Sequence, residues 1–361
     1  MSFQLRKKRA AAATKAAGGD GLLVTHLPDV RYLCGFTGSN AALALVGGRA
    51  VLFTDGRYTT QASAEAVGTR VVIEKRSAVA SACAWLEAAE VKRCGFDGTQ
   101  TTVAGLEAMR KAVSGKVRRG MFVAVGPLVA GLREVKDSEE ISRIRAAAAL
   151  GCRLFEEMLG VLRPGMTEQA VAAELEYAAR SAGAEAMSFE TIVASGERSA
   201  LPHGRASSAK LPKRGFITLD FGVVLDGYLS DMTRTVHMGR ALEGEREVYD
   251  SVLEAQETAV AAVRPGMAAG DVDEAARGVL RRAGLEEYFS HSTGHGVGLE
   301  IHEGPRLAAQ QMQPLKPGMV ITIEPGVYVP GRFGVRIEDM VLVTASDSEV
   351  LTPTAKAWIE L

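Results

Sequence analysis

The chain has 361 residues, 47% hydrophobic and 24% charged, and its formal net charge at pH 7 is −1. This length suffices for two domains with separate hydrophobic cores. A nearly neutral chain does not favour a nucleic acid or an anionic membrane as a partner, and no apolar run approaches the roughly 18 residues that a membrane-spanning helix needs.

The four cysteines are scattered and form no Cys-x-x-Cys pair; they are Cys34, Cys83, Cys94 and Cys152. Such thiols are typical of a reduced cytosolic protein. The basic start of the chain lacks the apolar segment of a secretory signal. We therefore expect a surface helix at residues 2–17 and, by default, a cytoplasmic location.

Residues 1–132 predict an α/β domain. Short apolar runs predict strands at 21–25, 41–46, 49–54, 71–74, 92–96 and 118–123, and a helix is expected at 80–89. No Gly-x-Gly-x-x-Gly follows any of these strands, so a dinucleotide site is not expected. His26 is the only histidine of this domain, and we expect it to be structural.

The boundary with the second domain falls near residues 126–133, where Pro127 and Gly131 are typical turn residues. A long helix is expected to open directly afterwards. Asp137 or Ser138 can cap it, and the glutamates that follow complement the positive end of its dipole.

The second domain contains an internal duplication. Residues 220–227 match residues 324–331 at a constant offset of 104. The matched acids are Asp220 with Glu324 and, after a short insertion, Asp231 with Glu338. The motif Arg-Pro-Gly-Met precedes both copies and leads each time into a helical pattern, which in the second copy predicts helices at 245–263 and 270–283. Residues 137–345 therefore predict two copies of a helix–helix–hairpin unit.

The first hairpin carries two acids, Asp220 and Asp231, on one face. Its turn centres either on Leu225 and Asp226, which puts the acids directly opposite each other, or on Asp226 and Gly227, which makes them diagonal neighbours. Like charges facing each other in a sheet are destabilising. Because the second hairpin adds two more acids to the same place, we expect divalent cations among the four.

Four of the six histidines gather in two short loops. His203 lies in a Leu-Pro-His-Gly segment, and a later glycine-rich loop contains His291, His295 and His302. The glycines on either side of His295 let the backbone approach a ligand closely. This clustering indicates a functional site, whereas His237, at the end of the first hairpin, is expected to be structural.

A set of carboxylates with one imidazole and no cysteine suits hard or borderline divalent ions, such as manganese or cobalt, better than a structural zinc site. Two such ions about 3.5–4 Å apart can share a water and lower its pKa, so that hydroxide is available near neutral pH. The predicted chemistry is hydrolysis of an amide, an ester or a phosphate.

The segments DFG…SDMTRT, HSTGHGVGLEIHE, IEPGVY and GVRIED resemble the metallopeptidase family with the pita-bread fold. The LPHG segment and the stretch RYLCGFTGSNAALAL followed by FTDGRY are similar to its Xaa-Pro peptidases, aminopeptidase P and prolidase. The resemblance implies an α/β (α+β) protein: an N-terminal α/β domain with a mixed sheet over residues 1–132, then a catalytic pita-bread domain over residues 133–361 whose duplicated halves are related by a pseudo-twofold axis.

The same resemblance implies two divalent metal ions, with manganese expected and cobalt or zinc as alternatives. The implied ligands are Asp220, Asp231, His295, Glu324 and Glu338. Asp231 and Glu338 would bridge both ions, and Glu324 would also act as the general base.

The remaining site residues are implied by the resemblance to act on the substrate or to support the ligands. His203 and His302 would contact the scissile carbonyl and stabilise the oxyanion. His291 would line the pocket for the proline ring or the group beyond it. Tyr328 and Arg336 match supporting positions, and a hydrogen bond from Arg336 to the ligand glutamate on its own strand face is expected.

The resemblance thus implies an aminopeptidase P-like enzyme that hydrolyses the Xaa-Pro bond at the N-terminus of small proline-containing peptides. An Xaa-Pro dipeptidase (prolidase) is the alternative. Methionine aminopeptidase shares the five ligands but usually lacks a domain like residues 1–132, and a metal-free pita-bread binding protein would lack ligands that are all present here. A homodimer is expected from the resemblance as well.

Overall fold

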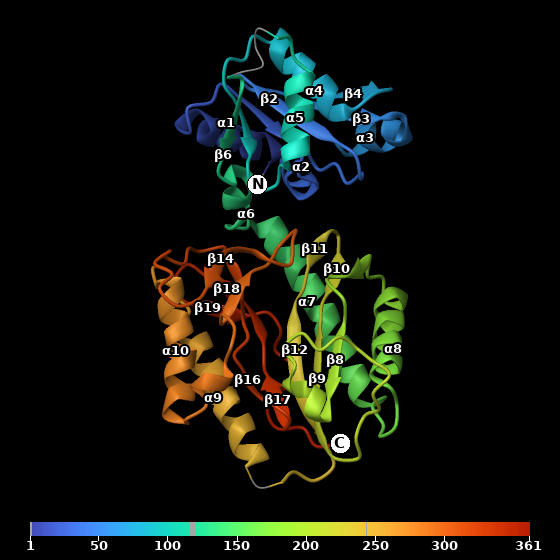
Figure 1. The fold of residues 1–361 in the computed structure, drawn as a ribbon, viewed down its shortest axis with the longest axis vertical. Helices are drawn as coiled ribbons and strands as arrows, with labels where there is room; N and C mark the ends of the chain where they lie inside the picture. Colours follow the sequence, from blue (N-terminus) through green and yellow to red (C-terminus); the bar gives the residue numbers. More distant parts are fainter. Residues whose placement is uncertain (1, 116–119, 243) are drawn as a thin grey trace. The chain divides into compact units, whose positions relative to one another are not determined.

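The computed structural model describes residues 2–115, 120–242 and 244–361 (Figure 1). The chain divides into two compact units, Met1–Arg133 and Glu134–Leu361. Within the described ranges, no helix combines the length and the hydropathy that crossing a membrane requires.

The N-terminal unit is built on one six-stranded sheet with the order β4-β3-β2-β1-β5-β6. Its strands are β1 (Gly21–Val24), β2 (Ala42–Val46), β3 (Arg49–Asp55), β4 (Arg70–Glu74), β5 (Cys94–Asp97) and β6 (Phe122–Val125). The pairs β1–β2 and β2–β3 are antiparallel, whereas β3–β4, β1–β5 and β5–β6 are parallel. The expected mixed sheet is therefore confirmed.

The helices of this unit are α1 (Phe3–Ala16), α2 (Leu27–Cys34), the 3₁₀ turn η1 (Gly56–Tyr58), α3 (Thr59–Glu65), α4 (Ala78–Ala88), α5 (Val103–Lys111) and α6 (Leu128–Arg133). Helix α1 confirms the surface helix expected at residues 2–17, and its inner face buries two charged side chains, Arg6 and Lys7. The Lys7 ammonium donates to the backbone carbonyls of Val67 and Gly68, at 2.8 and 2.7 Å, so the long side chain buries its stem while its charge is satisfied.

Two local predictions for this unit differ from the structure. The strand expected at 118–123 begins at Phe122, and residues 118 and 119 lie outside the described residues. The boundary at 126–133, expected to be a turn, contains helix α6. Pro127 directly precedes that helix, where a proline has no N–H to lose, so the same residue fits a helix start as well as a turn.

The second unit repeats a helix pair followed by a hairpin, as predicted. The first copy consists of α7 (Ser138–Leu159), α8 (Glu168–Ser181), β7 (Ala186–Met187), β8 (Ile192–Ser195), η2 (Gly196–Ala200), β9 (Gly215–Phe221), β10 (Val223–Leu225), β11 (Tyr228–Leu229) and β12 (Met232–Met238). The second consists of α9 (Glu245–Ala262), α10 (Ala269–Arg282), η3 (Glu286–Tyr288), β13 (Gly294–Gly296), β14 (Glu303–Leu307), β15 (Val320–Ile323), β16 (Gly326–Val329), β17 (Phe333–Arg336), β18 (Asp339–Val343) and β19 (Ser348–Val350).

Each half of the second unit has its own hydrophobic core. Apolar side chains of α7 and α8 pack on β9 and β12, with Leu219 and Phe221 fully buried. Those of α9 and α10 pack on β15 and β18, with Ile321 and Val341 fully buried. In Figure 1 helices α9 and α10 lie to one side of the strands and α8 lies to the other, so the strands of the two hairpins lie between helices.

Helix α7 begins as the sequence predicts. Asp137 is its N-cap: the carboxylate accepts hydrogen bonds from the backbone N–H groups of Glu139 and Glu140. The Glu140 carboxylate in turn accepts from the Asp137 N–H at 3.0 Å. This reciprocal capping box satisfies N–H groups that the first turn leaves unpaired.

The register of the first hairpin decides between the two turns that the sequence leaves open. Leu225 pairs with Tyr228, so Asp226 and Gly227 form a two-residue turn, and both have positive φ, 49° and 73°. Asp220 therefore lies opposite Thr233, and Asp231 is its diagonal neighbour.

The second hairpin differs in register, because Val329 pairs with Phe333 and three residues form its turn. The flanking pairs are Ile323 with Asp339 and Gly326 with Arg336. They place Glu324 directly opposite Glu338, so the two copies present their acids in different relative positions.

A buried ion pair ties the two hairpins together. Arg234 of β12 donates to the Asp339 carboxylate of β18 at 2.8 Å, and both side chains are almost completely buried. The same guanidinium donates to the backbone carbonyls of Thr233 and Glu338. Lys356 and Gln256 each bond the second oxygen of Asp339 at 2.9 Å.

Replacing Arg234 by methionine should lower the free energy of unfolding of the second unit by about 3–5 kcal/mol, because removal of one member of a buried ion pair leaves an uncompensated charge. Urea denaturation measures the loss. The matched control is Arg282→Met, whose exposed pair with Glu254 spans 3.7 Å and should contribute less than about 1 kcal/mol. Equal, small losses in both variants would show that the buried pair does not hold the hairpins together.

Candidate metal centre

The four matched acids and His295 come from five different places on the two hairpins and the loop before them. Asp220 lies on β9, Asp231 between β11 and β12, Glu324 between β15 and β16, Glu338 between β17 and β18, and His295 on β13. Asp220, Asp231 and Glu338 are buried, with 8%, 5% and 2% of their surfaces exposed. The sequence duplication thus brings acids from both halves to one place inside the unit.

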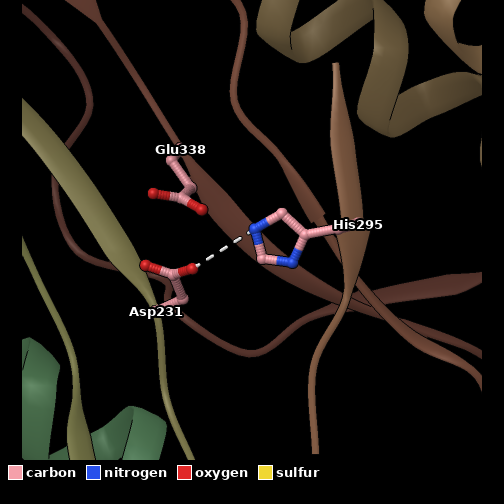
Figure 2. Close-up of side chains that lie close together, drawn as sticks. All are labelled: Asp231, His295 and Glu338. Atoms are coloured by element: carbon pink, nitrogen blue, oxygen red, sulfur yellow. Dashed lines mark ion pairs between the residues drawn. The ribbon is translucent and has the colours of Figure 1, made fainter. Parts of the chain in front are cut away.

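Three of these side chains converge most closely. Figure 2 shows Asp231, His295 and Glu338 pointing toward one another, and one ligand atom from each lies within 4.8 Å of the others. The His295 Nε2 atom lies 3.7 Å from Asp231 Oδ2 and 3.5 Å from Glu324 Oε1. An ion between these atoms would contact residues from both hairpins at once.

The protonation of His295 suits a ligand. Its Nδ1 atom lies 3.0 Å from the Gly296 carbonyl oxygen, which can only accept, so Nδ1 carries the hydrogen. Burial lowers the pKa of His295 to about 4, so the ring is neutral near pH 7. The lone pair of Nε2 therefore faces carboxylates, an arrangement that is repulsive unless a cation lies between them.

The pKa values of the acids are raised, whereas that of His295 is lowered. Burial, reinforced by Glu338 and Asp220, raises the pKa of Asp231 well above its usual value, and burial together with Glu324 does the same for Glu338. Burial raises the pKa of Glu324 to about 8. Like charges in a buried site resist ionisation until a cation compensates them.

Asp220 is stabilised in a different way. One of its oxygens accepts a hydrogen bond of 2.5 Å from the Arg336 guanidinium, while Oδ1 is buried and has no hydrogen-bond partner among the described residues. An unpartnered carboxylate oxygen beside three further acids and an imidazole lone pair is the donor set that divalent cations take. The residues present therefore fit a carboxylate-rich metal centre.

Arg336 does not bond the glutamate of its own strand face directly, contrary to expectation. Its Nε atom donates to Thr233 Oγ1 at 3.1 Å, and that hydroxyl donates to Glu338 Oε2 at 2.7 Å. Thr233 thus connects the guanidinium to Glu338, because the head of Arg336 turns across the sheet to Asp220. The sequence analysis missed this hydroxyl.

A second hydroxyl supports the other side of the site. The backbone N–H of His295 donates to Thr322 Oγ1 at 3.1 Å, and Thr322 lies 3.4 Å from Glu324 Oε1. Thr322 precedes Glu324 by two residues and Thr233 follows Asp231 by two. Because side chains two apart share a strand face, this spacing is the signal that could have identified both threonines.

Tyr328 and His291 extend the support in a chain of hydrogen bonds. The Arg336 guanidinium donates to the Tyr328 hydroxyl at 2.7 Å, and that hydroxyl lies 2.8 Å from His291 Nε2. His291 Nδ1 donates to the Ser292 carbonyl, so Nε2 accepts from Tyr328. Burial lowers the pKa of His291 to about 4 and raises that of Tyr328 to about 12, which keeps both rings neutral.

The site opens into a cleft of about 640 Å³. His203, His291 and His302 line it together with the five candidate ligands and Arg336. Its other walls are the apolar side chains Phe189, Ile192, Pro202 and Ile301 and the polar or charged residues Glu190, Arg205, Ser292, Glu303 and Arg306. The structure therefore brings together all ten candidate residues, with Tyr328 just behind the cleft wall.

The two remaining histidines lie elsewhere. His237 is buried and stacks on Trp358 with ring centres 5.1 Å apart, and its Nδ1 donates to the Gly239 carbonyl at 2.6 Å. His26 belongs to the N-terminal unit, where Nδ1 lies 3.3 Å from Asp29. Both positions agree with the structural roles expected from the sequence.

A duplicated hairpin scaffold with a carboxylate-rich centre in a cleft is typical of hydrolases that use two divalent ions. The chain belongs to metallopeptidase family M24, whose model matches residues 142–345. The model of the creatinase/prolidase N-terminal domain matches residues 6–135. The family resemblance identified from the sequence motifs is thereby confirmed, and membership implies divalent metal ions.

Individual relatives align over almost the whole chain. An Xaa-Pro dipeptidase from Pyrococcus horikoshii is 36% identical over 94% of this chain and 94% of its own. The structure of an Xaa-Pro dipeptidase from Bacillus anthracis superposes with a TM-score of 0.96 at 39% identity, covering 100% of both chains. The structure of an X-Pro aminopeptidase from Thermotoga maritima gives a TM-score of 0.88 at 34% identity, covering 97% and 100%.

The metal-free protein should lose stability as the pH rises from 6.5 to 8. Between the unfolded value near 4.5 and the folded value near 8, folded Glu324 holds more proton than the unfolded chain, so stability falls with rising pH. Asp231 and Glu338 act in the same direction. The folded rings of His291 and His295 are neutral, whereas the unfolded rings are still partly protonated just above pH 6.5, so the two histidines oppose this fall near pH 6.5 and contribute little slope towards pH 8.

Melting temperatures of the chelator-treated protein across this window measure the effect. Added manganese should raise the melting temperature more at pH 8 than at pH 6.5, because the ions displace fewer protons there. Glu338→Gln, which removes one of the titrating acids, should flatten the pH dependence. A melting temperature that rises with pH in the metal-free protein would contradict the burial of these acids.

Proposed function

We propose that the protein is a metal-dependent Xaa-Pro dipeptidase, which hydrolyses the bond before proline in dipeptides. The observation that carries the proposal is the convergence of four buried or partly buried acids on one neutral imidazole at the bottom of a cleft. The aminopeptidase P-like activity preferred from the sequence is less well supported, because the dipeptidase from Bacillus anthracis gives the higher TM-score and identity.

The residues that would hold two divalent ions are Asp220, Asp231, His295, Glu324 and Glu338. A pair of such ions would lower the pKa of a water shared between them and polarise the substrate carbonyl. Manganese is the ion we propose, since oxygen donors with one imidazole suit a borderline hard cation.

The protein's own side chains would orient the peptide and move the proton. His203 and His302 line the cleft beside the acids, where each can donate a hydrogen bond to the carbonyl oxygen as it gains negative charge. Glu324 would accept the proton of the attacking water and pass it to the departing proline nitrogen. That nitrogen carries no hydrogen in the peptide and must gain one to leave as a secondary amine.

The charged wall of the cleft supports a dipeptide rather than a longer chain. Arg205 pairs with Glu190 at 2.9 Å. Arg306 is exposed in the cleft and forms no ion pair with a described residue. The free carboxylate of a C-terminal proline is the group that such an unpaired guanidinium binds best, and in a longer peptide that carboxylate is replaced by an amide.

Glu324→Gln should lower kcat by at least about 100-fold, because the amide cannot take up the proton. Peptide binding should survive in part, and metal content measured by plasma emission separates loss of the proton carrier from loss of an ion. Glu190→Gln is the matched control: it lies on the same cleft wall but is largely exposed and outside the ligand set. Near-normal turnover by the Glu324 variant would show that another group handles the proton.

The manganese-loaded protein should hydrolyse Gly-Pro rapidly and Arg-Pro-Pro slowly, and chelation should abolish both reactions. Arg306→Met should raise KM for Gly-Pro by about 10- to 100-fold, the scale of a charge-assisted hydrogen bond, and should leave KM for the C-terminal amide of Gly-Pro unchanged. Faster hydrolysis of Arg-Pro-Pro would identify an aminopeptidase instead. Undiminished activity after removal of all metal would exclude the proposed function altogether.

A further inference from the structure

The loop that carries His302 is held by charged residues that the proposed mechanism does not use. His302 ends the connection 297–302 between β13 and β14. Its ring is exposed and lies edge-on to His295, with ring centres 4.4 Å apart, and its side chain makes no hydrogen bond with a described residue. The orientation of this imidazole therefore depends on the backbone of the loop.

Glu303, the next residue, turns its carboxylate inward and caps the loop. Its Oε1 atom accepts from the backbone N–H groups of Leu299 and Glu300, at 2.9 and 3.1 Å. The carboxylate packs directly on Gly298, where an added Cβ would lie 2.7 Å from Glu303 Oε2. A bare glycine is thus required for the carboxylate to close the turn.

Lys136 supplies the charge that compensates this carboxylate. Its ammonium donates to Glu303 Oε2 at 3.0 Å, and both side chains are nearly buried, with 1% and 5% exposed. The backbone of Lys136 is fixed in turn, because its N–H donates to the Gly318 carbonyl at 2.8 Å and the preceding Val135 bridges to Met319. Lys136 therefore connects the His302 loop to the segment that enters β15.

The other side of the loop is apolar. Val297 is fully buried in a cluster that also contains Ile144 of α7 and Tyr228 of β11, and Leu299 and Ile301 pack against it. Apolar packing fixes how deep the loop lies, but it does not specify the direction of the turn between residues 298 and 300. Hydrogen bonds provide that direction: the two to Glu303, and two at Gly298, whose carbonyl accepts from the Leu229 N–H and whose N–H donates to the Glu300 carbonyl.

We infer that Lys136 and Glu303 are positioning residues that aim His302 at the scissile carbonyl. The inference rests on the proposed function only in giving His302 its contact with the substrate. Lys136 bonds Glu303, and Glu303 bonds the backbone of Leu299 and Glu300, so both residues act on the loop that carries His302.

A double-mutant cycle with His302→Ala tests the inference, using whichever of Gly-Pro or Arg-Pro-Pro the manganese-loaded wild type hydrolyses. Lys136→Met should lower kcat by about 10- to 100-fold, the scale of a misplaced catalytic group, with KM and metal content nearly unchanged. Lys136→Arg, which retains the charge, should recover most of the activity. In the His302→Ala background the additional loss from Lys136→Met should be less than about 2-fold.

Gly298→Ala provides an independent variant that removes no charged group and displaces the Glu303 carboxylate from the turn. Gly298→Ala should lower kcat as Lys136→Met does, and it should cause little additional loss in the His302→Ala background. It replaces Lys136→Met in the test if that variant does not fold. The matched control is Arg281→Met, which breaks exposed ion pairs on α10.

Full multiplicative losses of Lys136→Met or Gly298→Ala in the His302→Ala background would overturn the inference. Hydrolysis of Arg-Pro-Pro in preference to Gly-Pro would overturn the dipeptidase assignment, but the double-mutant cycle could still be measured with Arg-Pro-Pro. Failure of the proposed function and failure of the positioning inference are therefore distinguishable.

Discussion

Mutual repulsion among the acids of the cleft is the constraint on which the second unit is built. Asp220, Asp231, Glu324 and Glu338 are held together in surroundings that raise the pKa of three of them. Hydrophobic cores on both sides keep the hairpins closed against this repulsion. The free energy of packing thus offsets the cost of a site that becomes favourable only when cations compensate the acids.

Strand alternation separates this repulsive site from an attractive one. Glu338 and Asp339 are neighbours in the chain and point to opposite faces of the sheet. Burial opposes ionisation of Asp339, but Arg234 and Lys356 outweigh it and hold its pKa below the usual value. The pKa of Glu338 is shifted the other way. The two adjacent acids therefore have different roles: Asp339 fixes the hairpins to each other, and Glu338 is available to a metal ion.

The three histidines of the glycine-rich loop differ in which ring nitrogens form hydrogen bonds within the protein, and this difference indicates their roles. His295 gives its N–H to a backbone carbonyl and keeps a lone pair for the acids. His291 uses both nitrogens within the protein, so it serves as a wall of the cleft. His302 bonds no described residue through either nitrogen, so the ring is available to a substrate and its orientation depends on its loop. The spacing of these histidines in the sequence indicated a common site, but it could not show which nitrogen of each ring carries the hydrogen.

The sequence by itself determined most of the elements, the family and the set of residues that could form the centre. The repeated acids, the helix caps and the Asp226-Gly227 turn are local patterns, so they predicted the duplicated helix–helix–hairpin units, the acids of the centre and the family. Tertiary structure decided what depends on contacts between distant segments. Hairpin register made Asp220 and Asp231 diagonal but Glu324 and Glu338 opposite, and it sent Arg336 to Asp220 with Thr233 as the link to Glu338. A one-residue change in loop length shifts which side chains face each other, and no local pattern records which partner a long side chain reaches across a sheet.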